Sequence, residues 1–143
     1  MAPIIPRFER LNREACKASI MIEGLTGKGK SGLAIMLAYG LVGGFKDGLT
    51  PEEKAALWDK IFAVDTENKS LNLFAGIPGS FGQNYGRIFG FQLTSEDGYN
   101  PSNYLIARDA AVKNGAEVFI ADSITHMWTA KGGVLDLVNE VKN

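Results

Sequence analysis

One eight-residue run constrains the fold of this chain more than any other feature of the sequence. The letters GLTGKGKS at positions 24–31 match the pattern G-x-x-x-x-G-K-[ST] in full. A short apolar segment, 18–23, comes directly before the run, and an apolar stretch without a helix breaker follows it from Lys30. We therefore expect a buried strand over 18–23, a glycine-rich loop, and a buried helix that Gly40 or the pair Gly43-Gly44 ends.

The residue types in this loop suit the phosphates of a nucleotide. Glycines let the backbone curl so that consecutive N–H groups point at phosphate oxygens, and the following helix presents its positive end to the same anion. The ammonium of Lys30 would then reach the β- and γ-phosphates, and the hydroxyl of Ser31 would bind Mg²⁺. The expected ligand is ATP with Mg²⁺. Lys28 occupies a position that the pattern leaves free, so a solvated side chain and a phosphate contact are equal alternatives. The residues expected to contact the nucleotide are Gly24, Leu25, Thr26, Gly27, Lys28, Gly29, Lys30, Ser31 and Gly32.

The rest of the chain alternates between segments typical of helices and of strands. Thr50-Pro51-Glu52-Glu53 predicts a helix start with an N-cap, a proline at the first helical position and a capping box. Strands separated by helices predict a parallel, doubly wound α/β sheet, with a site at the carboxyl ends of its strands. The expected helices span 52–60, 70–75, 103–113 and 133–141, the expected strands span 61–65, 87–93 and 117–121, and the segment 76–86 is expected to be a flexible loop.

Acidic residues end two of the expected strands. Asp122 follows 117–121 and is the preferred residue for holding magnesium through its water shell; the alternative, a turn aspartate, is disfavoured beside the glycine loop. Asp65 ends 61–65 and competes for this role. Glu67, two residues later, can polarise the attacking water as a general base. His126, the only histidine, follows Asp122 near the expected γ-phosphate, and a catalytic and a structural role are equal alternatives for it.

Composition bounds the class of protein. With 143 residues, 45% hydrophobic and 22% charged, the chain is expected to form one domain, 1–143, led by a polar segment, 1–17. A net charge of −1 provides no global attraction for nucleic acid. Cys16 is the only cysteine, so we expect a small buried residue in a reducing compartment. The uncharged run 33–45 is too short to span a bilayer, and the N-terminus is not typical of a signal peptide, so we expect a cytoplasmic protein without a membrane partner.

Four aromatic side chains invite a functional interpretation. Trp58 and Trp128 are expected to be core anchors rather than platforms for stacking bases. Phe81 and Tyr85 lie among glycines, where an ordinary loop is favoured over a mobile contact with nucleic acid.

Three stretches of the sequence together resemble the RecA-type P-loop ATPases, in particular the compact phage-encoded AAA-family ATPases that consist of little more than the RecA core. Beside the glycine loop, VDTE at 64–67 resembles the strand signature whose glutamate activates water, and IADS at 120–123 resembles the Walker B ending. The segment 122–133, with the letters DSITHMW and a glycine pair, is similar to the phage subgroup.

The resemblance covers about 19–141. It implies an oligomeric, DNA-dependent ATPase of phage recombination or single-strand annealing, acting in the host cytoplasm. Glu67 would be the catalytic base, with Lys30 and His126 stabilising the developing charge.

The sequence departs from this family after Asp122. In RecA-like folds the next strand inserts between the Walker B strand and the strand before the glycine loop, whereas here only one helix is expected before Asn143. We therefore expect a C-terminally incomplete sheet with an open edge. A truncated gene product, one half of a split protein, and a domain completed by a partner chain or a second copy are the alternatives. The polar sensor at the end of that strand is also missing, which favours nucleotide binding over turnover.

Three functional hypotheses follow, from different classes. The first is an ATPase that acts with single-stranded DNA, although the arginines of the lead segment, Arg7, Arg10 and Arg13, are equally typical of a solvated surface. The second is a nucleotide-binding interaction module with little or no hydrolysis. A small-molecule kinase ranks last, because a kinase lid needs several arginines and only Arg87 and Arg108 follow Lys30.

Overall fold

A three-stranded parallel sheet forms the centre of the molecule. The computed structural model describes residues 17–79 and 84–142 of the chain. Within them β1 (Ile61–Asp65) lies between β2 (Phe89–Gln92) and β3 (Val118–Asp122), and all three strands run in the same direction. Three of the four expected strands and the α/β class are thereby confirmed.

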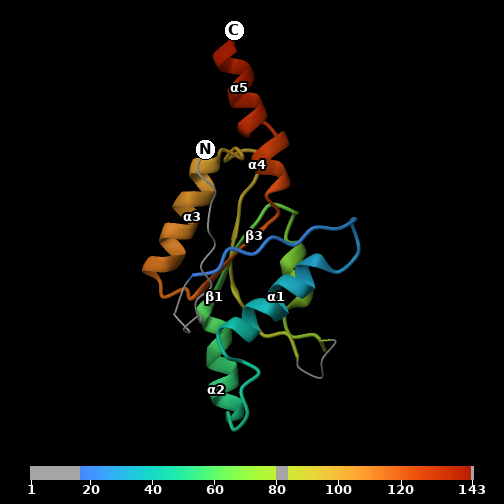
Figure 1. Cartoon of the computed structure of the whole chain (residues 1–143), viewed down its shortest axis with the longest axis vertical. Coiled ribbons are helices and arrows are strands. Elements are labelled where there is room, and N and C mark those ends of the chain that lie inside the picture. The colour runs from blue at the N-terminus through green and yellow to red at the C-terminus, as the bar shows by residue number, and fades with distance from the viewer. Residues whose placement is uncertain (1–16, 80–83, 143) are drawn as a thin grey trace, which may run out of the picture.

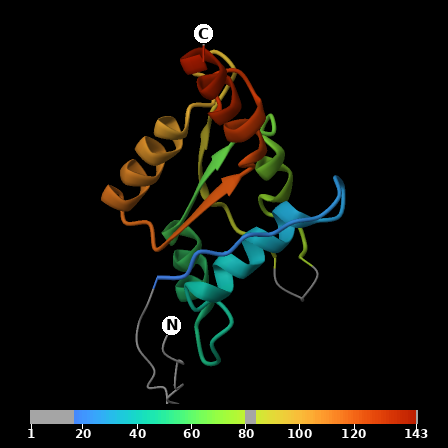
Figure 2. The same cartoon turned by 45° about the horizontal axis from the view of Figure 1, so that its top comes forward.

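Helices connect the strands and cover both faces of the sheet (Figures 1 and 2). α1 (Lys30–Leu41) packs on one face and α3 (Pro101–Lys113) on the other. Successive residues of a strand point to opposite faces, so β1 contributes Ile61 and Ala63 to the core under α1 and Val64 to the core under α3. Burial on both faces explains why this strand is a continuous apolar run.

The helix expected after the glycine loop is present as α1, but it is buried on one side only. Ile35, Met36 and Tyr39 are buried in the core, whereas Leu33 and Leu37 are exposed. Residues four apart lie on the same side of a helix, so these leucines form an apolar strip that faces away from the sheet.

The helix expected before β1 begins as the sequence predicts and then changes type. α2 (Pro51–Ala56) has Thr50 as its N-cap. The Thr50 hydroxyl accepts a hydrogen bond from the Glu53 amide at 3.1 Å, and the Glu53 carboxylate accepts one from the Thr50 amide at 2.8 Å. The chain then tightens into the 3₁₀ helix η1 (Leu57–Lys60), which leads directly into β1.

Three further helical elements follow the strands. η2 (Ser70–Phe74) comes after β1, and α4 (Thr125–Thr129) comes after β3. The sequence predicts η2 but not α4. α5 (Val134–Lys142) is the last element and projects away from the sheet beyond α4 (Figure 1).

The expected strand over 18–23 is wrong. Residues 17–25 have no regular secondary structure, and the side chains of Ile20 and Met21 are 55% and 66% exposed. An apolar run becomes a buried strand only where a neighbouring strand pairs with its backbone, and none of β1, β2 and β3 does so. In the described part of the chain, β3 is therefore an edge strand.

Aromatic residues confirm one sequence-based expectation and correct another. Trp58 is buried and stacks on Tyr39 with ring centroids 4.1 Å apart. Trp128 is 54% exposed and is no core anchor, because its neighbour Met127 takes the inward-facing position of α4. Tyr85 is buried under α1, which excludes the disfavoured alternative of a mobile contact at this residue.

Two regions with sequence-based expectations lie outside the described residues: the lead segment 1–16, with its arginines and Cys16, and the segment 80–83, with Phe81. Across the ranges 17–79 and 84–142, no helix has both the length and the apolar character needed to cross a bilayer.

Candidate functional site

The glycine loop, residues 24–31, forms an exposed turn directly before α1. Gly27 and Gly29 have φ angles of 75° and 78°, in a region that other residues rarely adopt. No heavy atom lies within 4 Å of the point where either glycine would carry a β-carbon. The left-handed backbone, rather than crowding, therefore requires glycine here, and the loop remains open to a ligand.

The first turn of α1 presents amide groups that no helical carbonyl satisfies. The N-cap is Gly29, which has no side chain that could accept a hydrogen bond from these amides. The amide of Leu33 donates to the Gly29 carbonyl at 2.9 Å, which leaves the amides of Lys30, Ser31 and Gly32 before the first helical hydrogen bond. The positive end of the helix dipole adds to their attraction for an anion.

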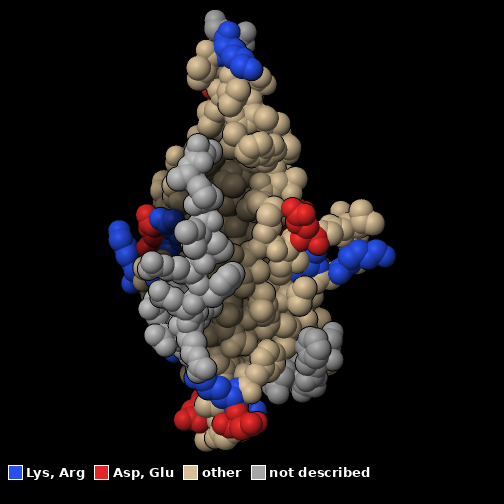
Figure 3. Space-filling model, in the orientation of Figure 1, with Lys and Arg blue, Asp and Glu red and all other residues tan. Residues whose placement is uncertain are grey.

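Lys30 folds back over the glycine loop. Its Nζ donates to the carbonyl oxygens of Gly24 at 2.8 Å and Leu25 at 3.0 Å. The Lys28 side chain is exposed and makes no hydrogen bond within the described residues. Figure 3 shows basic side chains projecting at the right edge, where Figure 1 places this loop. The loop itself, residues 24–31, thus carries two lysines and no acidic residue in a protein whose net charge is −1.

The ends of β1 and β3 carry aspartates that are partners in the sheet register, Asp65 and Asp122. Asp65 is only 4% exposed, and its two oxygens accept hydrogen bonds from the amides of Glu67 at 2.7 Å and Leu71 at 3.0 Å. Its carboxylate thus holds the turn from β1 into η2. This structural role explains why Asp65 is a poorer candidate than Asp122 for binding magnesium.

Asp122 and Glu67 lie at the rim of the sheet where β1 and β3 end, and both are more accessible to solvent than Asp65. Asp122 is half-buried, and its Oδ2 accepts a long hydrogen bond from the Ser70 hydroxyl at 3.4 Å. Glu67 is exposed, and its Oε1 accepts a hydrogen bond from the Ser123 hydroxyl at 2.8 Å. Ser123, which directly follows Asp122, therefore ties the candidate base to the end of β3.

His126 lies beside these carboxylates on α4. Its Nδ1 is 2.9 Å from the hydroxyl of Thr66, the residue between Asp65 and Glu67. Its ring stacks on Tyr99 with centroids 4.9 Å apart. The sequence places His126 near the end of β3, and the structure adds the neighbours that orient its ring.

Sequence reasoning missed three polar residues of this rim: Thr66, Ser123 and Tyr104. Tyr104 is buried, and burial raises the pKa of its phenol. The neutral phenol donates a hydrogen bond to the Ser123 carbonyl at 3.3 Å. Thr66 and Ser123 lie inside the segments VDTE and IADS, so their position beside the carboxylates in the sequence could have identified them. Nothing in the sequence points to Tyr104.

The glycine loop and the strand-end carboxylates approach one another through η2. A β-carbon on Gly32 would lie 2.9 Å from the ring of Phe74 and 3.0 Å from the hydroxyl of Tyr85, so the first turn of α1 packs closely on η2. In the described chain, however, no hydrogen bond joins the loop to Glu67, Asp122 or His126. The structure thus brings Glu67, Asp122 and His126 together. Lys30 and Ser31 form a separate group at the N-terminal end of α1.

A magnesium ion at this site would take some of its ligands from the bound nucleotide. Among residues 17–79 and 84–142, no group of three or more His, Cys, Asp and Glu side chains could hold a metal ion. Mg²⁺ bound with a nucleotide takes most of its ligands from phosphate oxygens and water. The Ser31 hydroxyl and the Asp122 carboxylate have the chemistry for this mode of binding.

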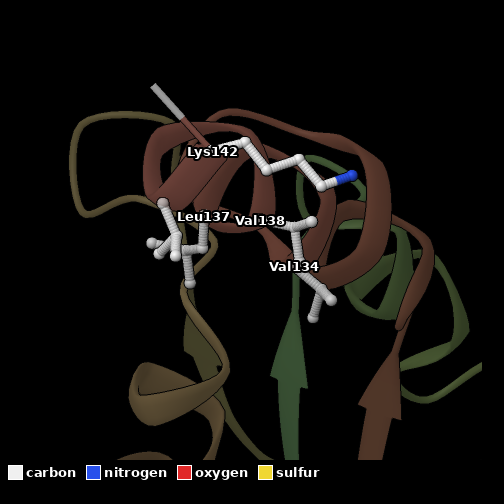
Figure 4. A pocket seen from close by; sticks show the side chains of 5 residues that line it. Val134, Leu137, Val138 and Lys142 are labelled. Carbon is white, nitrogen blue, oxygen red and sulfur yellow. The ribbon is translucent and has the colours of Figure 1, made fainter.

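Two apolar hollows in the described structure lie away from these residues. One, of about 520 Å³, lies between α3 and the sheet and includes Phe62, Phe91 and Ile106 in its lining. The other, of about 360 Å³, is formed by α5, where Val134, Leu137 and Val138 gather on one side of the helix (Figure 4). Neither hollow is lined by the residues of the glycine loop or by Glu67, Asp122 and His126.

Comparison of the chain with protein-family models, with curated proteins and with solved structures gave no match.

Proposed function

We propose that this chain is a RecA-like nucleotide-binding protein that holds ATP and Mg²⁺ at the glycine loop and hydrolyses ATP with Glu67 as the general base. The proposal rests on one observation above all: the loop combines open left-handed glycines, free amides at the start of α1 and an ammonium group folded over it.

The position of Lys30 explains how a triphosphate would be recognised. Its ammonium accepts no hydrogen bond and needs acceptor oxygens around it, which the carbonyls of Gly24 and Leu25 supply. Phosphate oxygens carry full negative charge and form shorter, stronger hydrogen bonds with an ammonium than neutral carbonyls do. A bound triphosphate would therefore draw the Lys30 side chain onto its β- and γ-phosphates while the loop amides hold the remaining oxygens.

Hydrolysis at this site is an in-line displacement. A water oxygen forms a bond to the γ-phosphorus, the bond from that phosphorus to the bridging oxygen breaks, and the products are ADP and phosphate. The proton of the water passes to the carboxylate of Glu67. Lys30 offsets the charge on the phosphate oxygens. Ser31 and, through water, Asp122 would hold Mg²⁺, which would supply further positive charge beside those oxygens.

Replacement of the candidate base separates binding from turnover. Glu67→Gln keeps the shape and the hydrogen bond from Ser123 but cannot accept the proton. We expect its ATP hydrolysis rate to fall by about 100-fold or more, with nucleotide affinity within about twofold of wild type. Phosphate release and equilibrium titration measure the two quantities. Glu52→Gln, at an exposed site in the first turn of α2, which precedes the amino end of β1, is the matched control, and equal hydrolysis rates for both variants would contradict the assignment of Glu67.

A second function has specific support: a nucleotide-binding interaction module that hydrolyses little. The glycine loop makes no hydrogen bond to the described carboxylates at the strand ends, so binding and catalytic groups form separate clusters. If wild type binds ATP tightly and releases no phosphate, this second function replaces the first. On the face drawn in Figure 3, the Lys and Arg side chains of the described residues lie scattered among acidic and neutral ones, so we assign no nucleic-acid surface.

A further inference from the structure

The hydroxyl of Thr66 lies at the centre of a small hydrogen-bonded group at the rim. Thr66 is only 5% exposed. Its Oγ1 lies 3.0 Å from the amide nitrogen of Ser123, 3.1 Å from the carbonyl oxygen of Ser123 and 2.9 Å from Nδ1 of His126. Each of these distances is within hydrogen-bonding range.

A count of protons decides how these contacts are made. A hydroxyl has one proton to donate and two lone pairs to accept with, and the Ser123 amide occupies one lone pair. If Thr66 gave its proton to His126, its oxygen would face the Ser123 carbonyl oxygen at 3.1 Å with no proton between them. If Thr66 gives its proton to that carbonyl instead, all three contacts are hydrogen bonds. His126 must then donate from Nδ1.

The surrounding groups are compatible with this arrangement. The Ser123 carbonyl also accepts from the Tyr104 hydroxyl at 3.3 Å, and a carbonyl oxygen has two lone pairs for its two donors. Tyr99 stacks on the His126 ring with an angle of 24° between the ring planes. Stacking and the Thr66 contact together fix the ring, and Nε2 makes no hydrogen bond within the described residues.

We propose that Thr66 is a positioning residue that holds neutral His126 as the Nδ1–H tautomer and so leaves Nε2 as an acceptor. The hydrogen bond at one ring nitrogen determines the protonation of the other. In the proposed hydrolysis, on which this part of the inference depends, neutral His126 would accept a hydrogen bond from the attacking water beside Glu67. It would not donate one to the γ-phosphate, which differs from the charge-stabilising role that the sequence suggested.

The tautomer can be measured without any nucleotide. His126 is the only histidine, so long-range ¹⁵N–¹H correlation spectra of the labelled chain report this ring alone, at a pH where it is neutral. We expect the Nδ1–H pattern in wild type and in Thr66→Ser, which keeps the hydroxyl. Thr66→Val, which keeps the shape and removes the hydroxyl, should shift the ring toward the Nε2–H form. An Nε2–H pattern in wild type would overturn the proposal, and that measurement does not depend on whether a variant folds.

Kinetics then test the positioning role. We expect Thr66→Val to lower kcat about 10-fold or more with KM nearly unchanged, and Thr66→Ser to restore most of the rate. If Thr66→Val changes the tautomer but keeps the wild-type kcat, the positioning role is wrong. If wild type shows the Nδ1–H tautomer but neither binds nor hydrolyses ATP, the proposed function fails while the tautomer assignment stands.

Discussion

Asp65 and Asp122 show how two identical side chains in equivalent positions acquire different roles. They are partners across β1 and β3, but only Asp65 is buried and accepts hydrogen bonds from two backbone amides. Asp122 accepts one long hydrogen bond from Ser70 and is half-exposed. The first aspartate therefore stabilises the turn from β1 into η2, and the second is available for a ligand.

Asparagine substitutions should separate these roles. Asp65→Asn replaces one acceptor oxygen with an NH₂ group that faces a backbone N–H, so we expect a loss of about 1–3 kcal/mol in the free energy of unfolding. Asp122→Asn should leave the melting temperature within about 2 °C of wild type, a change of well under 1 kcal/mol, and should weaken the Mg²⁺ dependence of ATP binding. Thermal unfolding and titration at varied Mg²⁺ measure the two effects. A large loss of stability in Asp122→Asn alone would reverse the assignment.

The sequence predicts the place of the candidate residues better than their contacts. Glu67, Asp122 and His126 come together because parallel strands end at the same rim, which the order of elements already implies. The role of Asp65 was not predictable from the sequence. Its carboxylate accepts hydrogen bonds from the amides of Glu67 and Leu71, and these amides reach it only when the chain turns from β1 into η2. Thr66 and Tyr104 were missed because neutral polar residues carry no motif of their own.

At the scale of elements, the start of α2 was predictable from a local signal, whereas the segment 18–23 and α4 were predicted incorrectly for two different reasons. The start of α2 followed from the capping box at Thr50, which involves residues three apart. The segment 18–23 has the composition of a strand, but a strand also requires a partner from elsewhere in the chain, and no composition rule supplies one. α4 was missed because five residues are too few for a periodic pattern.

Two glycines, one shortly before β2 and one within it, test the packing of the core. A β-carbon on Gly86 would overlap the indole ring of Trp58, whereas one on Gly90 would meet no heavy atom within 4 Å. We expect Gly86→Ala to lower the free energy of unfolding by about 1–3 kcal/mol through overpacking. Gly90→Ala should be neutral or slightly stabilising, because it restricts the unfolded chain. Chemical denaturation measures both, and equal losses would show that the Trp58 contact is not tight.

At the scale of the whole molecule, the proposed function requires a local attraction for an anion in a chain that carries a net charge of −1. The N-terminal end of α1 and the two lysines of the glycine loop provide this local attraction. Lys30 is held over the loop by Gly24 and Leu25, while Lys28 extends into solvent. If the loop recognises phosphate through a defined arrangement of groups, Lys30 and Lys28 must contribute unequally to the binding free energy. If it attracts phosphate only through its overall positive charge, the two lysines should contribute equally.

Calorimetric titration of the full chain with ATP and Mg²⁺ tests the central claim most directly, with Lys30→Met and Lys28→Met as a matched pair. The predicted result is saturable binding of one ATP per chain by wild type. Lys30→Met should weaken that binding by about 10-fold or more, equivalent to about 1.4 kcal/mol, while Lys28→Met should change it by less than about threefold, or ~0.7 kcal/mol. Absence of saturable binding to the wild-type chain, or equal losses in the two variants, would contradict the account.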